Sequence, residues 1–173
     1  MVNIKVGDTV PQGKFATVPY SPELEDGLAC GVPTKISTDA WKGKKVVIFA
    51  VPGAFTPTCH SNHLPPYLQN YDAFKAKGVD VIAVLSANDP FVLSGWTRVQ
   101  NVKDKLVALS DVEGAWSKEL GLTIDLSGLG IGLGTRTTRY ALVLDDLVVK
   151  YIGVEEDPTQ VTASGADAVL AAL

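Results

Sequence analysis

Cys59 is the residue whose type and setting are best suited to chemistry in this sequence. It closes the segment Pro52-Gly-Ala-Phe-Thr-Pro-Thr-Cys59, which separates an apolar run from a helical pattern. Thr56 followed by Pro57 is a helix-start signal, because threonine caps orphan N–H groups and a proline at the first helical position sacrifices no hydrogen bond. Cys59 then falls in the first turn, where unpaired N–H groups and the positive end of the helix dipole favour the thiolate. Since the thiolate is the nucleophilic form of cysteine, the segment predicts nucleophilic thiol chemistry.

Other interpretations of the two cysteines are less favoured. A lone cysteine is usually a small buried apolar residue, and the only other cysteine is Cys30. No Cys-x-x-Cys pair is present, which argues against a general thiol–disulfide oxidoreductase, and a structural disulfide is a poor default in a reducing compartment. With Cys59, the nearby His60 and His63 give at most three ligands where zinc normally takes four, so we expect no metal. No cofactor is expected either.

The segment that carries Cys59 is expected to join a buried strand to a helix. Residues 46–51 are apolar, rich in β-branched side chains and stopped by Pro52-Gly53, which is typical of a strand buried on both faces. Residues 79–86 have the same character, and apolar residues recur at helical spacing over 64–74, which predicts a β-α-β unit. Because α/β folds place ligands beyond the carboxyl ends of strands, Cys59 is favoured as a functional residue.

The remaining elements predict the fold class. Strands at 140–144 and 147–152, separated only by Asp145 and Asp146, indicate an antiparallel hairpin. The glycine-rich residues 128–134 are expected to form a flexible surface loop. Further elements are expected as helices at 89–101, 113–120 and 164–173, a strand at 106–110, and a hairpin of 15–18 with 30–37. This order is typical of an α/β, thioredoxin-like fold, with a central mixed sheet flanked by helices and an N-terminal β-hairpin extension.

Length and composition narrow the classes of protein. A chain of 173 residues with 46% hydrophobic and 20% charged residues is expected to form one globular domain, residues 1–173. The net charge is −4 and no basic cluster stands out, so nucleic acid is not an expected partner. No apolar run reaches about 18 residues and the N-terminus lacks a signal-peptide pattern, so we expect an intracellular protein that does not insert into membranes.

The motif Pro-x-x-x-Thr-x-x-Cys, filled by Pro52, Thr56 and Cys59, resembles the active-site motif of peroxiredoxins. The fuller string, followed by His63-Leu-Pro, is similar to the type II, peroxiredoxin-five-like branch, and the likeness covers essentially the whole chain. Further matching segments are Gly78–Val81, Asn88-Asp89, Trp96 and Arg139–Val143. The resemblance implies a thiol-dependent peroxidase that reduces hydrogen peroxide and alkyl hydroperoxides and serves redox homeostasis. A redox sensor or relay that passes oxidation to partner proteins is the alternative.

The resemblance also implies roles for individual residues. Cys59 would attack the O–O bond and become a sulfenic acid. Thr56 would present its hydroxyl to the thiolate and the peroxide, and Pro52 would shield the thiolate from water. Arg139 would place its guanidinium against the sulfur and stabilise charge on the leaving oxygen. Without the resemblance, Arg139 would be interpreted as a solvated surface residue.

Neighbouring polar residues receive lesser roles. Arg98 is expected to be a surface residue, although it resembles a second basic position of the family. His63 is expected to be structural, hydrogen-bonded near the loop, and His60 to be exposed. Pro65-Pro66 falls inside the helix that follows Cys59, where missing hydrogen bonds would weaken the turns around the thiol.

The sequence leaves the fate of the sulfenic acid open. Many type II relatives resolve it with a C-terminal cysteine, but Ala163 stands at that place here. An external thiol could attack Cys59 directly. Alternatively Cys30, which resembles the second cysteine of the fungal alkyl hydroperoxide reductase branch, would form a disulfide with Cys59. The sequence leaves open whether Cys30 reaches the Cys59 of its own chain or of a neighbour, and the resemblance implies an intersubunit disulfide in a homodimer. Thioredoxin is the reductant that the resemblance implies, with glutaredoxin or glutathione as alternatives. The cytoplasm is the expected location and the peroxisome the alternative.

Overall fold

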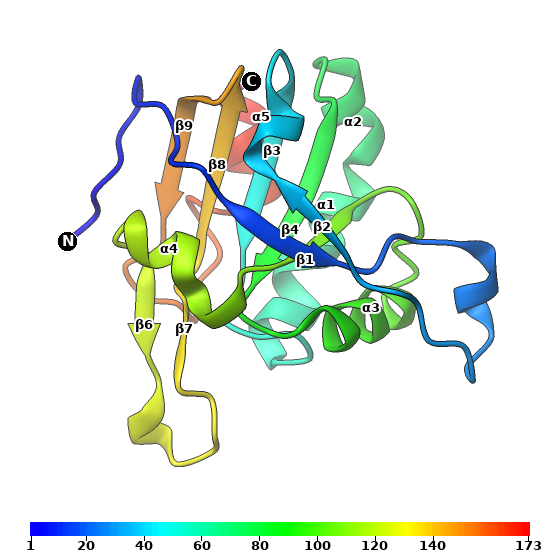
Figure 1. Cartoon of the computed structure of the whole chain (residues 1–173). Coiled ribbons are helices and arrows are strands. Elements are labelled where there is room, and N and C mark those ends of the chain that lie inside the picture. The colour runs from blue at the N-terminus through cyan, green and yellow to red at the C-terminus, as the bar shows by residue number, and fades with distance from the viewer.

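The computed structural model describes all 173 residues. The chain is built around a seven-stranded mixed sheet (Figure 1). The strand order is β2-β1-β5-β4-β3-β8-β9, in which β3, β4 and β5 are parallel to one another. The strands are β1 (Lys14–Thr17), β2 (Thr34–Ser37), β3 (Lys45–Ala50), β4 (Val81–Ser86), β5 (Val107–Ser110), β8 (Tyr140–Asp145) and β9 (Val148–Val154). The α-helices are α1 (Leu64–Gln69), α2 (Tyr71–Ala76), α3 (Pro90–Val99), α4 (Ala115–Glu119) and α5 (Ala166–Ala171). No helix combines the length and the apolar character that crossing a bilayer requires.

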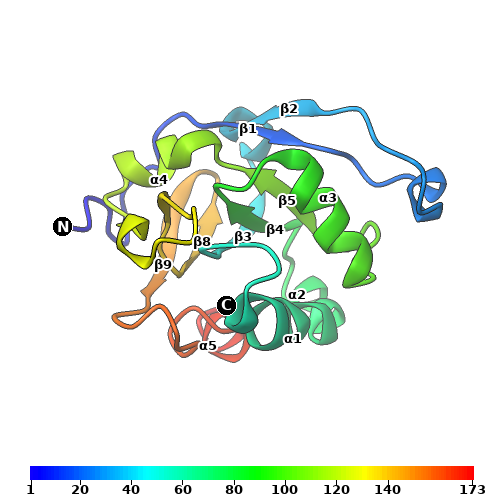
Figure 2. The same ribbon diagram turned by 90° about the horizontal axis from the view of Figure 1, so that it is seen from below.

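Helices cover both faces of the sheet because its central strands are apolar on both sides. In β3, Val47 and Phe49 enter one core while Val46 and Ile48 enter the other. Figure 2 shows α1, α2 and α5 together against one face and α4 against the opposite face. This confirms the expected thioredoxin-like α/β architecture, with a continuously apolar strand buried between two layers.

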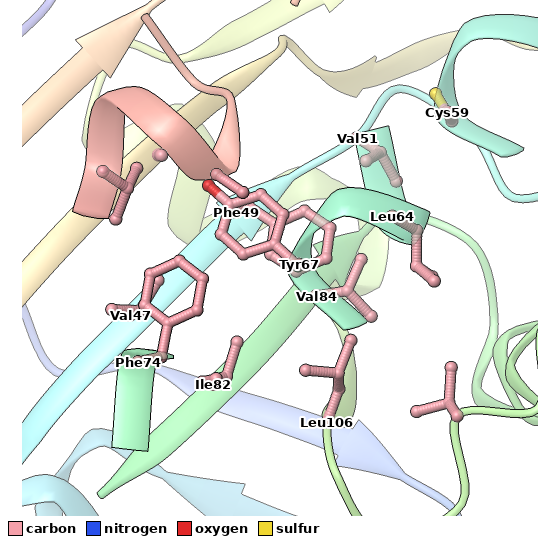
Figure 3. Close-up of a cluster of buried hydrophobic side chains, with 14 of the residues drawn as sticks. Val47, Phe49, Val51, Cys59, Leu64, Tyr67, Phe74, Ile82, Val84 and Leu106 are labelled. Carbon is pink, nitrogen blue, oxygen red and sulfur yellow. The ribbon is translucent and has the colours of Figure 1, made fainter. Parts of the chain in front are cut away.

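A stack of aromatic rings fixes the helix that follows Cys59 onto the sheet. The ring centroids of Phe49 and Tyr67 lie 3.9 Å apart with nearly parallel planes, and Phe74 stacks on Tyr67 at 5.4 Å. Figure 3 shows this stack, with Val51 and Cys59 farther along the same core. The packing anchors α1 and holds the end of β3 close to Cys59.

The register of the sheet brings two distant segments to one edge. Strand β8 runs antiparallel to β3 and pairs Tyr140 with Ala50. The residue that precedes β8 is Arg139, so it lies beside the loop that leaves β3. A strand pairing across about ninety residues of sequence therefore places Arg139 at the edge where the Cys59 segment begins.

Several expected elements differ in detail. The N-terminal hairpin is confirmed as β1 paired with β2, and β1 also joins the main sheet by pairing Ala16 with Ser110. The single helix expected over 64–74 is two helices, which meet at Asn70. The turn between β8 and β9 is Asp146–Leu147 rather than Asp145-Asp146. Both turn residues have positive φ, 49° and 68°, which suits a two-residue turn between twisted strands.

A two-stranded hairpin, β6 (Thr123–Asp125) with β7 (Thr135–Thr137), was not expected from the sequence. The glycine-rich residues 128–134 form its tip and most of them are exposed, which agrees with the expected surface loop. Gly130, Gly132 and Gly134 all have positive φ, a conformation that glycine adopts at no steric cost. These short strands escaped prediction because three residues are too few for a periodic pattern.

Candidate active site

The loop between β3 and the Cys59 helix is held in a tight turn. Asn88 accepts the N–H of Ala54 at 2.8 Å, and the Thr56 hydroxyl donates to the Gly53 carbonyl at 2.7 Å. Phe55 has a φ of 62°, in the left-handed region that bulky residues rarely adopt. A Cβ on Gly53 would lie 2.9 Å from the Thr56 methyl group, so a larger residue there would require the Thr56 side chain to move. The turn leads the chain directly into the helix start.

The helix begins at Pro57, as the sequence predicts. The carbonyl of Thr56 accepts the N–H of His60 at 2.9 Å, while the N–H groups of Thr58 and Cys59 donate to no protein acceptor. The expected side-chain cap is wrong, because the Thr56 hydroxyl bonds back to Gly53 instead of a helical N–H. The free N–H groups therefore stay available beside the thiol.

The turn that carries Cys59 is a π-helical segment, Cys59–His63, rather than an ordinary α-turn. Leu64 donates its N–H to the carbonyl of Cys59, five residues back. Pro65 and Pro66 follow at once and have no N–H, so two carbonyls of this segment lack the donor that an α-helix would supply. The prolines thus give a physical reason for the widened turn, and the segment has fewer hydrogen bonds than a regular helix.

Cys59 is a free thiol that is only 1% exposed. An amine of the Arg139 guanidinium, Nη2, donates to its Sγ at 3.2 Å. The interpretation of Arg139 as a solvated surface residue is therefore excluded, since the side chain is 2% exposed and points into the same site.

The rest of the guanidinium is also bonded. Arg139 Nε donates to the carbonyl of Pro158 at 2.8 Å, and Nη1 lies 2.9 Å from Nδ1 of His63. The ion pairs of the structure, Lys42–Asp39 and Lys103–Glu25, do not involve Arg139. Arg139 is thus a buried cation without a carboxylate partner, and the remaining contact of its guanidinium is the sulfur of Cys59.

His63 is fully buried between Arg139 and the C-terminal loop. Its Nε2 lies 2.9 Å from the carbonyl of Ser164. Burial above all, with the charge of Arg139 in addition, lowers the pKa of His63 from 6.5 to about 4; the Ser164 hydrogen bond and Glu155 act in the opposite direction. His63 is therefore a neutral imidazole at physiological pH.

The other candidate residues lie in different settings. Thr56 and Pro52 belong to the same loop as Cys59 and are half-buried, with the Thr56 proton directed to Gly53. Cys30 is exposed, between the N-terminal 3-10 turn and β2, and is a free thiol. An exposed Cys30 and a buried Cys59 form no disulfide within this chain.

Two expectations about neighbouring residues are wrong. His60 is half-buried instead of exposed: its Nδ1 accepts the indole N–H of Trp96 at 3.0 Å, and its carbonyl accepts the amide of Gln100 at 2.9 Å. Arg98 is also half-buried, and its Nη1 donates to the carbonyls of Leu24 and Ala29 at 2.9 and 3.1 Å. Helix α3 thus contacts both the Cys59 segment and the loop that leads to Cys30.

Sequence reasoning missed the contact between His63 and Arg139. The four-residue spacing of Cys59 and His63 was the available signal, because it places two side chains on one face of a helix. The contact of Arg98 with Leu24 and that of Gln100 with His60 gave no such signal, since the two partners of each contact lie tens of residues apart in the chain.

Comparisons with known proteins agree with this geometry. Residues 5–170 match the family model described as Redoxin. A putative peroxiredoxin of Malassezia furfur is 54% identical over 162 residues, which cover 92% of this chain and 96% of the relative. A putative peroxisomal peroxiredoxin of Lipomyces kononenkoae is 47% identical, with 92% and 95% covered. The solved structure of reduced Prx3 from Vibrio vulnificus in complex with hydrogen peroxide is 39% identical, with 98% and 95% covered and a TM-score of 0.83.

The family model spans nearly the whole chain, and the Malassezia relative matches 92% of the chain. With a buried thiol facing a buried arginine at the end of a central strand, the chain belongs to the Redoxin family and is a peroxiredoxin, a thiol-dependent peroxidase.

Proposed function

We propose that Cys59 is the nucleophile that this peroxidase uses against hydroperoxides. Its thiolate attacks the terminal oxygen of the peroxide, the O–O bond breaks, and Cys59 becomes a sulfenic acid. The other oxygen leaves with the bonding electrons and takes up a proton, so that water or an alcohol is released. The observation that carries the proposal is the 3.2 Å contact between Arg139 Nη2 and Cys59 Sγ, made by a buried cation without a carboxylate partner.

Thr56 and Pro52 are proposed to complete the site. The Thr56 hydroxyl donates its hydrogen to the Gly53 carbonyl, so its oxygen can still accept a hydrogen bond from an incoming hydroperoxide. Pro52 supplies no N–H and keeps water from the approach to the thiolate. The free N–H groups of Thr58 and Cys59 and the Arg139 guanidinium are donors for the oxygen on which charge develops.

Hydrogen peroxide and alkyl hydroperoxides are the proposed substrates. Hydrogen peroxide is the ligand named for the Vibrio relative, whose chain is similar over almost its full length. Phe55, which is 51% exposed beside the site, supports acceptance of an apolar alkyl group as well.

The sulfenic acid is proposed to be resolved by Cys30 of a second subunit, with thioredoxin, glutaredoxin or glutathione reducing the resulting disulfide. Cys30 is an exposed free thiol, so it is accessible to a neighbouring molecule, and its own Cys59 is buried. This proposal makes the protein a homodimer. The cytoplasm is the proposed location; the Lipomyces relative, called peroxisomal, supports the peroxisome as the alternative.

A peroxide-mixing experiment tests the nucleophile. Reduced protein mixed with one equivalent of hydrogen peroxide should consume it stoichiometrically and yield a trappable sulfenic acid at Cys59. The Cys59→Ser variant should lose this reaction while keeping its fold, because a serine hydroxyl stays protonated at this site. Consumption at the parent rate by Cys59→Ser would refute the assignment.

The Cys30→Ser variant in the same assay tests the resolving step. It should keep the first peroxide reaction, but it should lose the peroxide-induced covalent dimer on a non-reducing gel. It should also accumulate more sulfinic acid at Cys59, because the resolving thiol is gone. Normal turnover of this variant with thioredoxin would show that Cys30 takes no part.

A further inference from the structure

His63 contacts the Arg139 guanidinium at a nitrogen other than the one that contacts Cys59. Arg139 uses its three nitrogens on three different partners: Nε on Pro158, Nη1 on His63 and Nη2 on the sulfur. A planar guanidinium has one orientation in which all three contacts are met. Contacts at Nε and Nη1 therefore decide where Nη2 points.

The tautomer of His63 follows from its two neighbours. A carbonyl only accepts, so Nε2, which faces Ser164, must carry the proton. Nδ1 is then unprotonated and accepts the N–H of Arg139 Nη1 at 2.9 Å. A second proton on this imidazole would set two N–H donors and two positive charges against each other. The neutral state that burial imposes on His63 agrees with this arrangement.

The Ser164 carbonyl is itself held in place by a buried carboxylate. Glu155, 6% exposed, accepts the N–H and the hydroxyl of Ser164 at 2.7 Å each. It also accepts the N–H and the hydroxyl of Thr162, at 2.7 and 2.6 Å. The loop that faces His63 is thus fixed by four hydrogen bonds to one side chain.

We propose that His63 is a positioning residue of the peroxidase reaction, which acts as a neutral acceptor that fixes the Arg139 guanidinium against the Cys59 sulfur. This inference rests on the proposed role of Cys59. His63 takes no proton from the thiol, because its acceptor nitrogen is occupied by Arg139 and its other nitrogen is a donor. The ionisable groups that face it are Arg139 before β8, Glu155 in the C-terminal loop and Tyr67 on α1, and Cys59 of its own segment contacts the same guanidinium.

The test compares two replacements of His63. In His63→Leu both hydrogen bonds are lost, and the guanidinium is free to turn away from the sulfur. The rate of peroxide attack should fall roughly tenfold or more, as it does when an oriented donor is lost. The rising limb of the pH–rate profile should also move to higher pH, because a displaced cation stabilises the thiolate less. In His63→Gln the amide oxygen can accept from Arg139 and the amide nitrogen can donate to Ser164, so most of the rate and the position of the limb should return.

Tyr67→Phe is the matched control. The Tyr67 hydroxyl donates to the same Ser164 carbonyl at 2.7 Å but does not contact Arg139. Its loss should lower stability and leave the pH–rate limb where it is. If His63→Leu does not fold, His63→Asn replaces it, because the shorter amide cannot reach both partners.

Three results would overturn the proposal: a parent-like rate and limb in the Leu or Asn variant, an equal loss in the Gln variant, or the same limb shift in Tyr67→Phe. Failure of the assignment of Cys59 is separately visible. In that case the unmodified protein itself would not form a sulfenic acid at Cys59.

Discussion

A buried arginine without a carboxylate needs another anion nearby. Arg139 is 2% exposed and its polar contacts are a carbonyl, a neutral imidazole and a thiol. Of these three groups, the thiol is the one that the proposed mechanism uses as the nucleophile. In the proposed mechanism the same guanidinium remains adjacent when negative charge passes from sulfur to the leaving oxygen. In that mechanism one residue supports both the nucleophilic sulfur and the transition state.

Replacing Arg139 should therefore slow the first step with peroxide. We expect Arg139→Ala to lower its second-order rate constant by roughly two to three powers of ten, the usual cost of an oriented donor at developing charge. Arg139→Lys keeps the charge but cannot meet three partners in one plane, so it should recover only part of the rate. Stopped-flow fluorescence of the reduced protein measures the rate, with circular dichroism as the check on folding. A parent rate in Arg139→Ala would contradict the role.

At the scale of elements, helix α3 contacts the segment that would have to open after oxidation in the proposed reaction. Cys59 is 1% exposed, so the sulfenic acid proposed there would meet another thiol only if the segment Cys59–His63 moved. That segment already lacks helical donors because of the prolines that follow it. Two hydrogen bonds oppose opening. The indole N–H of Trp96 on α3 donates to the His60 imidazole, and the side-chain amide of Gln100, at the C-terminal end of α3, donates to the His60 carbonyl. The missing helical hydrogen bonds favour opening of the segment and the hydrogen bonds to His60 oppose it, so their balance sets how easily the segment opens.

Gln100→Ala should shift this balance towards opening. Losing one hydrogen bond of about 1 kcal/mol would raise the open population roughly fivefold. During turnover with excess peroxide, the variant should therefore accumulate severalfold less sulfinic acid at Cys59, as measured by mass spectrometry. Thr97→Ala is the control, because the Thr97 hydroxyl bonds only to carbonyls of its own helix. Equal sulfinic acid in Gln100→Ala and the parent would contradict the argument.

The sequence predicted what depends on local pattern and missed what depends on distant contacts. The apolar run of β3 and the Thr56-Pro57 signal predicted the buried strand and the helix that starts at Pro57, since each is encoded in neighbouring residues. Arg98 was misjudged because its acceptors lie about seventy residues earlier in the chain. The burial of Arg139 follows from strand register, which no local pattern encodes; only the family resemblance pointed to its place beside Cys59.

At the scale of the whole molecule, the site joins three stretches of chain around one sheet edge. These are residues 52–63, Arg139 before β8, and the loop 155–164 after β9. The contacts among them pass through buried polar groups, namely Glu155, Ser164 and His63. Global stability and the geometry of the site are therefore coupled through ionisable residues, which makes stability depend on pH.

His63 gives that dependence a definite sign. Its pKa is lowered from 6.5 to about 4, mainly by burial and in addition by the charge of Arg139. Between pH 6.5 and about pH 4, His63 is therefore protonated in the unfolded chain and neutral in the folded chain. The stabilisation is complete above about pH 6.5 and is lost as pH falls towards 4. About 2.5 pKa units at about 1.36 kcal/mol each give a loss of about 3 kcal/mol in the free energy of unfolding.

The His63→Gln variant carries no proton at residue 63 in this pH range, and the carboxylates, including Glu155, are present in both proteins. Urea unfolding from about pH 7.5 to about pH 4.5 should therefore show the parent losing about 2 to 3 kcal/mol more than His63→Gln. Parallel stability curves for the two proteins would mean that His63 is not held neutral by the fold.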